Sequence, residues 1–322
     1  MAEFIVEQGQ NSIGVYDGVC ILICFEARSI ADYIECLKDI RSECLYGRND
    51  SRLYYRGEPN DYGNTAGQPG INRGRWLDGD NESDLFRECE RRLPQEFAEC
   101  RTTFEKLVKM QHYRVPTRLL DISLDPLQAL FFALYIDPKS KSGDNRDAVV
   151  LVYGIPKKAI LNWHSDKVSV ISNVATYGYD DLDVARLSRN KEDFNASESI
   201  HHLLHEIRAE KPHFLPEIEI DHLESIYCVH PLLDNPRIRM QQGAFLLFGI
   251  NGNKHRLATF ESNKGPKIQM MKIQIPQCAK VRVRDELNML GKTVDNVYPD
   301  WDGVSDYFGR FYGKPVADYY KR

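Results

Sequence analysis

Apolar residues recur at helical spacing in the first half of the chain. Between positions 30 and 40 they follow Ser29, a candidate N-cap, and precede Gly47, which predicts an amphipathic helix. A second helical pattern covers residues 83–110, where Pro94 is expected to break or kink the helix. The first half of the chain is therefore predicted to be rich in helices.

A third helix is predicted at residues 125–135, where Asp125 is suited to cap the helix and Pro126 to occupy its first turn. This segment is apolar on nearly every side, so it is expected at the centre of the core. Two more helices are predicted at 197–207 and 284–290.

The other apolar runs are short and β-prone, and most lie in the second half of the chain. The expected strands are residues 18–25, 52–57, 148–153, 168–171, 225–229, 244–248 and 268–275. The aromatic tail from Tyr307 to Tyr320 is expected to pack against the sheet. Because no repeat or linker divides the chain, we predict a single-domain α+β fold with helices mainly in the first half, around a mixed or antiparallel sheet.

Composition and charge exclude several classes of protein. Hydrophobic residues at 42% and charged residues at 28% are typical of a globular chain. The formal net charge of −5 argues against a broad basic face for nucleic acid but leaves a local basic groove open. The run at 18–25 is too short to cross a bilayer, and the eight cysteines form no Cys-x-x-Cys pair. We therefore expect a soluble cytoplasmic protein with free thiols and no membrane partner.

Arg56 is the first candidate for chemistry, because it stands at the end of a predicted strand, before the turn-forming residues 57–60. A guanidinium suits bidentate phosphate binding, and Gly57 would let a ligand approach the backbone closely. The alternative is that Arg56 only pairs with a local carboxylate such as Glu58. The loop at 60–81 is long enough to suggest a function, and it lies between Arg56 and the second candidate segment.

That second segment covers residues 111–121, where a hydroxyl, a guanidinium and a carboxylate occur within five positions. Pro116 forces the residue before it out of helical geometry, so the chain must turn and can present His112 and residues 117–121 on one rim. The alternative is a capping network in which Asp121 caps the following helix and pairs with Arg118.

These segments resemble the FRG-domain family. The family is named for Phe-Arg-Gly, where this chain has Tyr55-Arg56-Gly57, and its signature Gln-His-Tyr-Gly-x-Pro-Thr-Arg-Leu-Leu-Asp is similar to residues 111–121. Arg114 replaces the usual glycine, so a side chain there would narrow a pocket or alter the turn. Further segments similar to family signatures are 129–133, 235–245 and 297–303. The resemblance implies an FRG domain at 29–314, an N-terminal strand or extension at 1–28 and a tail at 315–322.

The resemblance also implies a reaction. A strand that ends in aromatic-Arg-Gly is similar to the first motif of mono-ADP-ribosyltransferases, which implies an ADP-ribosyltransferase-like core that uses NAD as its substrate. Such a site needs a cation for the pyrophosphate, a platform for the nicotinamide and a hydrogen-bonding group at the ribose. Arg56 would hold the pyrophosphate with support from Arg118, and Tyr113 or Tyr55 would be the platform. The expected cofactor-binding residues are Tyr55, Arg56, Gly57, Tyr113, Thr117 and Arg118.

Gln241, just before Gly243 and a predicted strand, stands where many transferases of that fold have a glutamate. A glutamine can hydrogen-bond a hydroxyl but cannot act as a base, so catalysis would rest on Asp121, on His112 or on a weaker mechanism. The alternatives are that Gln241 satisfies strand backbone groups, and that His112 is a phosphate contact or a core histidine bonded to a carbonyl. The expected catalytic residues are His112, Asp121 and Gln241.

Other chemical signals are weak. His201 and His205 lie one helical turn apart beside Glu206, but the order does not match a zinc protease and no third ligand is evident. We interpret this segment as a solvated helix face and expect no metal. No phosphate-loop, dinucleotide-binding or hydrolase-elbow motif occurs.

Two classes of function follow from these motifs. The first is an NAD-binding ADP-ribosyltransferase-like enzyme, a toxin or phage-defence component that modifies a protein or nucleic acid. The second is a non-catalytic module that binds a nucleotide or a nucleic-acid end through Arg56 and Arg118. A third interpretation is that the motifs only hold the fold together. The expected partners are a nucleotide ligand and an unidentified macromolecular acceptor.

Overall fold

The computed structural model describes residues 24–45, 50–135, 146–179, 182–233 and 239–297. Most of the predicted strand at 18–25 and the aromatic tail lie outside these residues, as do most of the segment 297–303 and the first four residues of 235–245. Among the described cysteines no disulfide is formed. Within the described part of the chain, no helix is both long enough and apolar enough to cross a membrane.

The predicted helices of the first half are present, and local capping explains where they begin. In α1 (Ile30–Leu45) the Ser29 hydroxyl accepts a hydrogen bond from the Asp32 amide. In α5 (Pro126–Leu134) the Asp125 carboxylate accepts from two backbone amides of the first turn. The pattern at 83–110 forms α2 (Asn81–Arg92), α3 (Pro94–Phe97) and α4 (Thr103–His112), and Pro94 begins the second of these.

Eight strands form one mixed sheet in the order β1-β10-β4-β2-β3-β7-β6-β5. The β1–β10 and β5–β6 pairs are parallel, and the other neighbours are antiparallel. A separate two-stranded sheet contains β8 (Ile250–Asn251) and β9 (Asn253–Leu257). The eight strands are β1 (Cys24–Glu26), β2 (Ser51–Glu58), β3 (Leu119–Ser123), β4 (Ala148–Pro156), β5 (Ile160–Asn162), β6 (Ile226–His230), β7 (Gly243–Phe248) and β10 (Gln269–Ile275).

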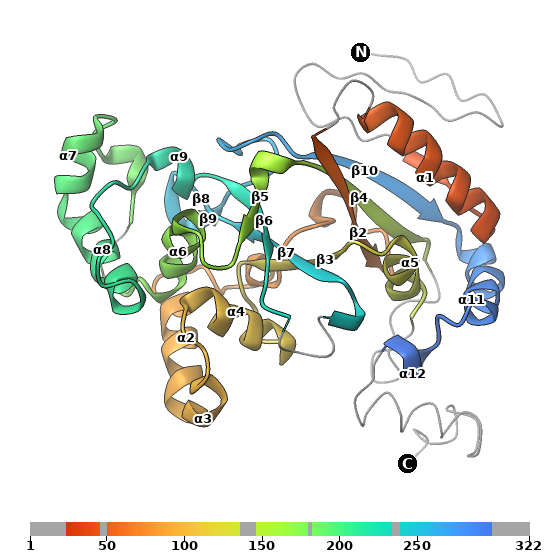
Figure 1. Cartoon of the computed structure of the whole chain (residues 1–322), viewed down its shortest axis with the longest axis horizontal. Coiled ribbons are helices and arrows are strands. Elements are labelled where there is room, and N and C mark those ends of the chain that lie inside the picture. The colour runs from red at the N-terminus through yellow and green to blue at the C-terminus, as the bar shows by residue number, and fades with distance from the viewer. Residues whose placement is uncertain (1–23, 46–49, 136–145, 180–181, 234–238, 298–322) are drawn as a thin grey trace.

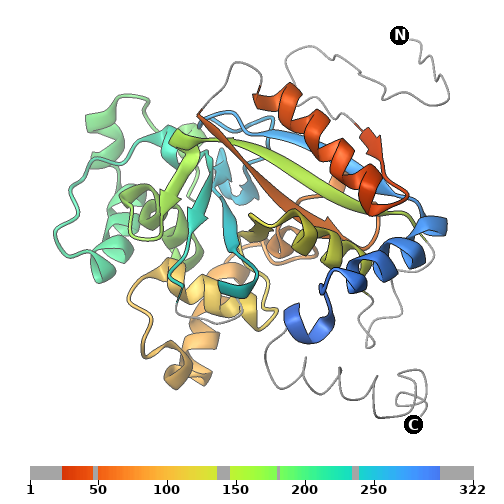
Figure 2. The same cartoon turned by 45° about the vertical axis from the view of Figure 1, so that its right-hand side comes forward.

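The sheet is divided into two parts between β2 and β3 (Figures 1 and 2). All eight residues of β2 pair with β4, whereas β2 and β3 share only the Tyr55–Ser123 pair. The β1-β10-β4-β2 part and the β3-β7-β6-β5 part are therefore joined at one point. On both sides of this point the two strands are free to diverge, and this divergence makes room for a site.

Three clusters of buried side chains hold these layers together. The first joins the two parts of the sheet to α2 and α4, and the second packs α1, α5 and α11 (Lys280–Met289) on β4 and β10. Val150 and Val152 of β4 belong to the second cluster, whereas Leu151 and Tyr153 belong to the first, as expected for side chains that alternate across a sheet. The third cluster lies around α7 and α8, at the opposite end of the molecule from α1 and α11 (Figure 1). The remaining helices are α6 (Asp166–Ser172), α7 (Lys191–Ala196), α8 (Glu198–Glu210), α9 (Ile220–Leu223) and α12 (Val294–Val297).

Two predictions about the fold are wrong. The predicted strand at 168–171 is part of helix α6, whose first turn is capped by the Ser165 hydroxyl. Every residue from Val168 to Ser172 is buried, so the run has no polar face that would reveal a helical period. The predicted concentration of helices in the first half is also wrong, because α6, α7, α8, α9, α11 and α12 lie in the second half and strands of both halves share the sheet.

Candidate functional site

A cavity of about 440 Å³ lies where the two parts of the sheet diverge. Its walls come from the end of β2, the end of α4 with the turn after it, strand β3, helix α5 and the start of β7. This volume is in the range of small-molecule sites in proteins, ~300–1,000 Å³. The side chains on its walls that matter for chemistry are Tyr55, Arg56, Gln111, His112, Arg114, Asp121, Ser123, Phe132, Gln241 and Phe245.

Arg56 bridges the gap between β2 and β3 at the wall of the cavity. Its Nη1 donates to the backbone oxygen of Asp121 at 2.9 Å, and its Nε donates to Glu58 Oε1 at 3.1 Å. Burial lowers the pKa of Arg56, but the negative charges of Glu58 and Asp121 raise it by more than burial lowers it. The pKa of Arg56 therefore lies above its ordinary value. The guanidinium is therefore permanently charged, and its Nη2 makes no hydrogen bond to a described residue.

Glu58 holds Arg56 in this orientation. The carboxylate is 1% exposed, and its Oε1 also accepts a hydrogen bond from the Gly67 amide at 3.2 Å. The alternative that Arg56 pairs with Glu58 is thus confirmed, but it does not remove Arg56 from the cavity. Burial, and then the charge of Glu58, raise the pKa of the nearby Tyr153 hydroxyl well above its ordinary value, so that group stays protonated.

The turn after α4 contains a residue in the left-handed region, which explains the usual glycine at position 114. Arg114 has a φ of 63°. Its amide donates to the Gln111 oxygen, and the Val115 amide donates to the Met110 oxygen, both at 3.0 Å. These two bonds form a Schellman motif, whose left-handed position is most often a glycine. The turn is thus kept with arginine at some cost in strain, and the Arg114 side chain is added to the wall of the cavity.

Replacing Arg114 by glycine should stabilise the protein. A left-handed conformation costs an ordinary residue roughly 1–2 kcal/mol, and the extra freedom of glycine in the unfolded chain offsets about half of that gain. We expect the free energy of unfolding to rise by roughly 0.5–1 kcal/mol in urea denaturation. The matched control is Arg114→Ala, which removes the same side chain but keeps Cβ. Equal stability of the two variants would contradict this explanation.

Asp121 presents a carboxylate to the cavity from the middle of β3. Its side chain is 59% exposed, and Oδ2 lies 4.0 Å from Arg56 Nη1. The same Oδ2 accepts a hydrogen bond from Gln111 Nε2 at 2.8 Å. The alternative role for Asp121, capping the next helix and pairing with Arg118, is wrong, because Asp125 caps α5 and Arg118 pairs elsewhere.

Gln241 closes the cavity from the turn before β7. Its backbone oxygen accepts a hydrogen bond from the Ser123 hydroxyl at 2.6 Å, which ties this turn to the end of β3. Its side-chain Nε2 is buried and has no hydrogen-bond partner among the described residues. The alternative, in which the Gln241 side chain hydrogen-bonds backbone groups of a strand, is therefore not seen for Nε2 among the described residues. The next residue, Gln242, has a φ of 45°, and it shares such a positive φ only with Arg114 among the described non-glycine residues.

Residues 51–142 match the family model of the FRG domain. The chain contains an FRG domain. The matched residues include Arg56 and the segment 111–121, whereas Gln241 lies beyond their end. No curated protein and no solved structure matches the chain. The ADP-ribosyltransferase-like core thus stays a prediction.

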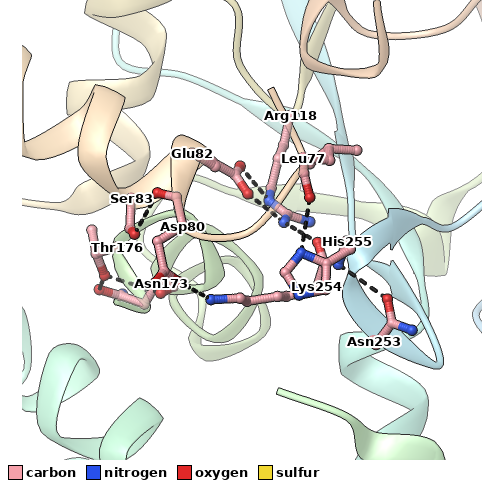
Figure 3. A network of polar contacts seen from close by, with 10 residues as sticks. All are labelled: Leu77, Asp80, Glu82, Ser83, Arg118, Asn173, Thr176, Asn253, Lys254 and His255. Carbon is pink, nitrogen blue, oxygen red and sulfur yellow. Dashed lines mark hydrogen bonds and ion pairs between the residues drawn. The ribbon is translucent and has the colours of Figure 1, made fainter. Parts of the chain in front are cut away.

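Arg118 of the FRG domain does not face the cavity, which corrects its expected role in cofactor binding. The side chain is fully buried and donates two hydrogen bonds to the Glu82 carboxylate and one, at 3.0 Å, to the Lys254 backbone oxygen. Figure 3 shows it directed at the start of α2 and at β9, where Lys254 pairs with Asp80 and the His255 ring bonds the Leu77 oxygen. Arg118 therefore joins the FRG motif to distant segments of the fold and is not available to a ligand.

Of three more expected cofactor-binding residues, two have structural roles in the FRG domain and one lies outside the cavity. Thr117 is 1% exposed, and its hydroxyl bonds Gln111 and the Leu119 amide. Tyr113 is exposed outside the cavity. Gly57 lies at the cavity, but a Cβ there would lie 1.9 Å from the Ala129 oxygen, so the glycine is required by helix α5.

Six of the expected residues line the cavity together: Tyr55, Arg56, Gly57, His112, Asp121 and Gln241. Sequence reasoning missed Gln111, Ser123, Phe132 and Phe245 as cavity residues. Gln111 could have been found from helical spacing, because it precedes His112 at the end of α4 and lies one turn after Val108, which also lines the cavity. Ser123, Phe132 and Phe245 come from three different elements, and no local signal places them together.

The histidine pair on α8 lies far from this site along the chain. His201 and His205 are both exposed, and Glu206 pairs with Arg87 at 3.1 Å. Across the described ranges, no group of three His, Cys, Asp or Glu side chains is arranged to hold a metal ion.

Proposed function

We propose that the cavity of the FRG domain binds NAD and that the protein transfers ADP-ribose from it to a macromolecular acceptor. The observation that supports this most is the position of Arg56 and Asp121 on one cavity wall, 4.0 Å apart. In NAD the pyrophosphate and the nicotinamide ribose are adjacent groups. A cation beside a carboxylate matches this order, with the pyrophosphate at Arg56 and the ribose at Asp121.

The guanidinium of Arg56 supplies the anion contact. Two of its nitrogens are held by Glu58 and by the Asp121 backbone oxygen, so the side chain is preorganised and its Nη2 is left for a phosphate oxygen. Arg114 adds a second positive charge to the cavity wall. A nucleoside, which has no phosphate, would lose the contacts with Arg56 and Arg114 and bind more weakly.

The carboxylate of Asp121 acts where charge develops. The bond between the ribose C1′ and the nicotinamide nitrogen breaks, and its electron pair leaves with neutral nicotinamide. Positive charge grows on the ribose, and the negative carboxylate stabilises it. The acceptor O–H or N–H then bonds to C1′ and releases one proton. Asp121 thus takes the part that a glutamate at position 241 would have had, and the Gln241 amide hydrogen-bonds the ribose.

Aromatic groups suited to hold the nicotinamide line the same cavity. Tyr55 remains as the predicted platform, since Tyr113 lies outside, and Phe132 and Phe245 add two further rings. His112 lines the cavity from the end of α4, where a neutral imidazole can take the proton that the acceptor releases. Modification of a cellular macromolecule in this way would suit a toxin or a phage-defence component.

A second function, ligand binding without turnover, is favoured by the amide at position 241. Gln241 Nε2, which has no hydrogen-bond partner among the described residues, is a good donor to a ligand hydroxyl, but it carries no charge. A non-catalytic module for a nucleotide or a nucleic-acid end would use Arg56 in the same way and would leave Asp121 as a passive wall.

Nicotinamide release from NAD by the purified chain separates these functions. We expect slow release by the wild-type protein and at least about a hundredfold lower kcat in Asp121→Asn, because a neutral amide cannot stabilise the ribosyl cation. The matched control is Asp78→Asn, which changes a surface aspartate of similar exposure, 55% against 59%, that also lies beside an arginine. Saturable NAD binding without release would favour the second function. Equal rates in wild type and Asp121→Asn would contradict the role of Asp121.

A further inference from the structure

The Gln111 carboxamide connects the buried Thr117 hydroxyl to the carboxylate in the cavity. Thr117 Oγ1 donates a hydrogen bond to Gln111 Oε1, and Gln111 Nε2 donates one to Asp121 Oδ2, both at 2.8 Å. The Thr117 hydroxyl itself accepts from the Leu119 backbone amide at 3.1 Å. Thr117, Gln111 and Asp121 therefore form a series of hydrogen bonds that leads from the buried Leu119 amide to the open cavity.

The chemistry of these groups fixes which way the carboxamide points. The single hydroxyl proton of Thr117 is given to Gln111 Oε1. If the carboxamide were turned over, its oxygen would face the Asp121 carboxylate, and two acceptors would meet without a proton between them. The buried end of this arrangement is rigid, because Thr117 is 1% exposed and precedes β3. The carboxamide is thus held with its NH₂ group toward Asp121.

We propose that Gln111 is a positioning residue, which fixes the Asp121 carboxylate with Oδ2 occupied and Oδ1 presented to the ribose. This inference rests on the proposed function for its consequence in catalysis, but the hydrogen-bond arrangement itself does not. Asp121 Oδ1 makes no hydrogen bond to a described residue, whereas Oδ2 accepts from Gln111. One oxygen is thereby engaged and the other is left for the developing cation.

Several charged or titratable groups surround this carboxylate and must be considered in any test. Arg56 lies on the neighbouring strand with Glu58 behind it, and His112 and Arg114 line the cavity from α4 and its turn. Gln111 is the one neutral donor to the carboxylate among the bonds that the described residues make with it. A substitution at Gln111 therefore changes the orientation of Asp121 and leaves the charged side chains of Arg56, Glu58 and Arg114 in the protein.

The catalytic test compares Gln111→Glu with the distant control Gln95→Glu, which adds the same charge on the exposed surface of α3. Gln111→Glu replaces a donor by a second carboxylate beside Asp121. We expect kcat for nicotinamide release to fall at least tenfold with little change in KM, and the acidic limb of the pH profile to move to higher pH. Thr117→Ser, which keeps the hydroxyl, should retain the wild-type rate, and the isosteric Thr117→Val should lose part of it.

A second test does not depend on turnover. In a ¹H–¹⁵N NMR spectrum of the full chain, the side-chain proton of Gln111 that bonds Asp121 should resonate well downfield of its twin. Asp121→Asn and Thr117→Val should each reduce this separation, and Thr117→Ser should preserve it. If wild-type protein releases no nicotinamide but the NMR result holds, the arrangement is confirmed and the proposed reaction fails. An unchanged Gln111 signal in Asp121→Asn, or an unchanged kcat in Gln111→Glu with an active wild type, would overturn the inference.

Discussion

Replacing Arg118 by alanine is expected to lower the free energy of unfolding by about 3–5 kcal/mol, the range for breaking a buried ion pair by removing one partner. The side chain is fully buried, and its loss leaves Glu82 and the Lys254 backbone oxygen without their donor. Three segments that are far apart in the chain meet at this pair: the start of α2 with the loop before it, the start of β3, and β9 (Figure 3). Guanidinium denaturation followed by circular dichroism measures the loss.

The matched control for this prediction is Arg91→Ala. Arg91 also makes two hydrogen bonds to one glutamate, Glu88, but the arginine is 68% exposed. An exposed pair of this kind contributes only ~0–1 kcal/mol, so we expect little change. If Arg118→Ala were as mild as Arg91→Ala while NAD binding was lost, Arg118 would be a ligand contact, as the sequence predicted, and our placement of it would be wrong.

Replacing Gly57 by alanine is expected to have the second large effect. The new Cβ would lie 1.9 Å from the Ala129 oxygen and 2.4 Å from the Ala133 nitrogen, and both are backbone atoms of α5. Because α5 is packed between β2 and the helices α1 and α11, it cannot retreat without disturbing the core. We expect a loss of at least about 3 kcal/mol, at the upper end of overpacking effects, measured by urea denaturation.

Gly178→Ala is the control for this substitution. A Cβ at Gly178 would meet its nearest neighbour, the Ser83 hydroxyl, at 3.4 Å, which is an ordinary contact. We therefore expect a stability close to that of the wild type. A Gly57→Ala protein of unchanged stability that failed to bind NAD would instead support the original prediction, in which the glycine makes room for a ligand.

The secondary structure could largely be predicted where its cause is local. Ser29 and Asp125 cap helices that begin where expected, and Pro94 begins a new helix within the apolar pattern at 83–110. The segment at 168–171 could not be assigned, because a short run that is buried on every side has no periodicity to read. The division of the sheet between β2 and β3 also has no local signal, since it depends on strands from both halves of the chain.

Part of the site could be predicted from the sequence. Arg56, Asp121, His112 and Gln241 do meet in one cavity, although Gln241 is far from the others along the chain. The prediction for Arg118 is wrong because it treats residues 117–121 as one rim on which every side chain is available. Residues 119–123 form a strand, and in an extended chain the side chains of Arg118 and Asp121, three positions apart, point to opposite sides. Alternation along this segment would have shown that only one of them can face the cavity.

Arg114 illustrates a departure from a motif that only the structure explains. The sequence shows that an arginine replaces the usual glycine, but not which of the two expected consequences follows. The positive φ shows that the turn keeps its left-handed geometry, and the cavity wall shows that the side chain adds to the site. Of the two expected consequences, the added side chain at the cavity is therefore the one that follows, and the turn itself is not altered.

The most direct test of the central claim is a crystal structure of the protein with ADP-ribose, supported by calorimetric titration of the wild type and Arg56→Lys. We predict that the pyrophosphate contacts Arg56 Nη2 in the cavity between β2 and β3 and that the ribose lies beside Asp121. Arg56→Lys should weaken binding at least tenfold, because the compact ammonium of lysine does not reproduce the planar guanidinium that reaches Glu58, the Asp121 oxygen and a phosphate from separate nitrogens. Absence of binding at millimolar ADP-ribose, or density for the ligand outside this cavity, would contradict the account.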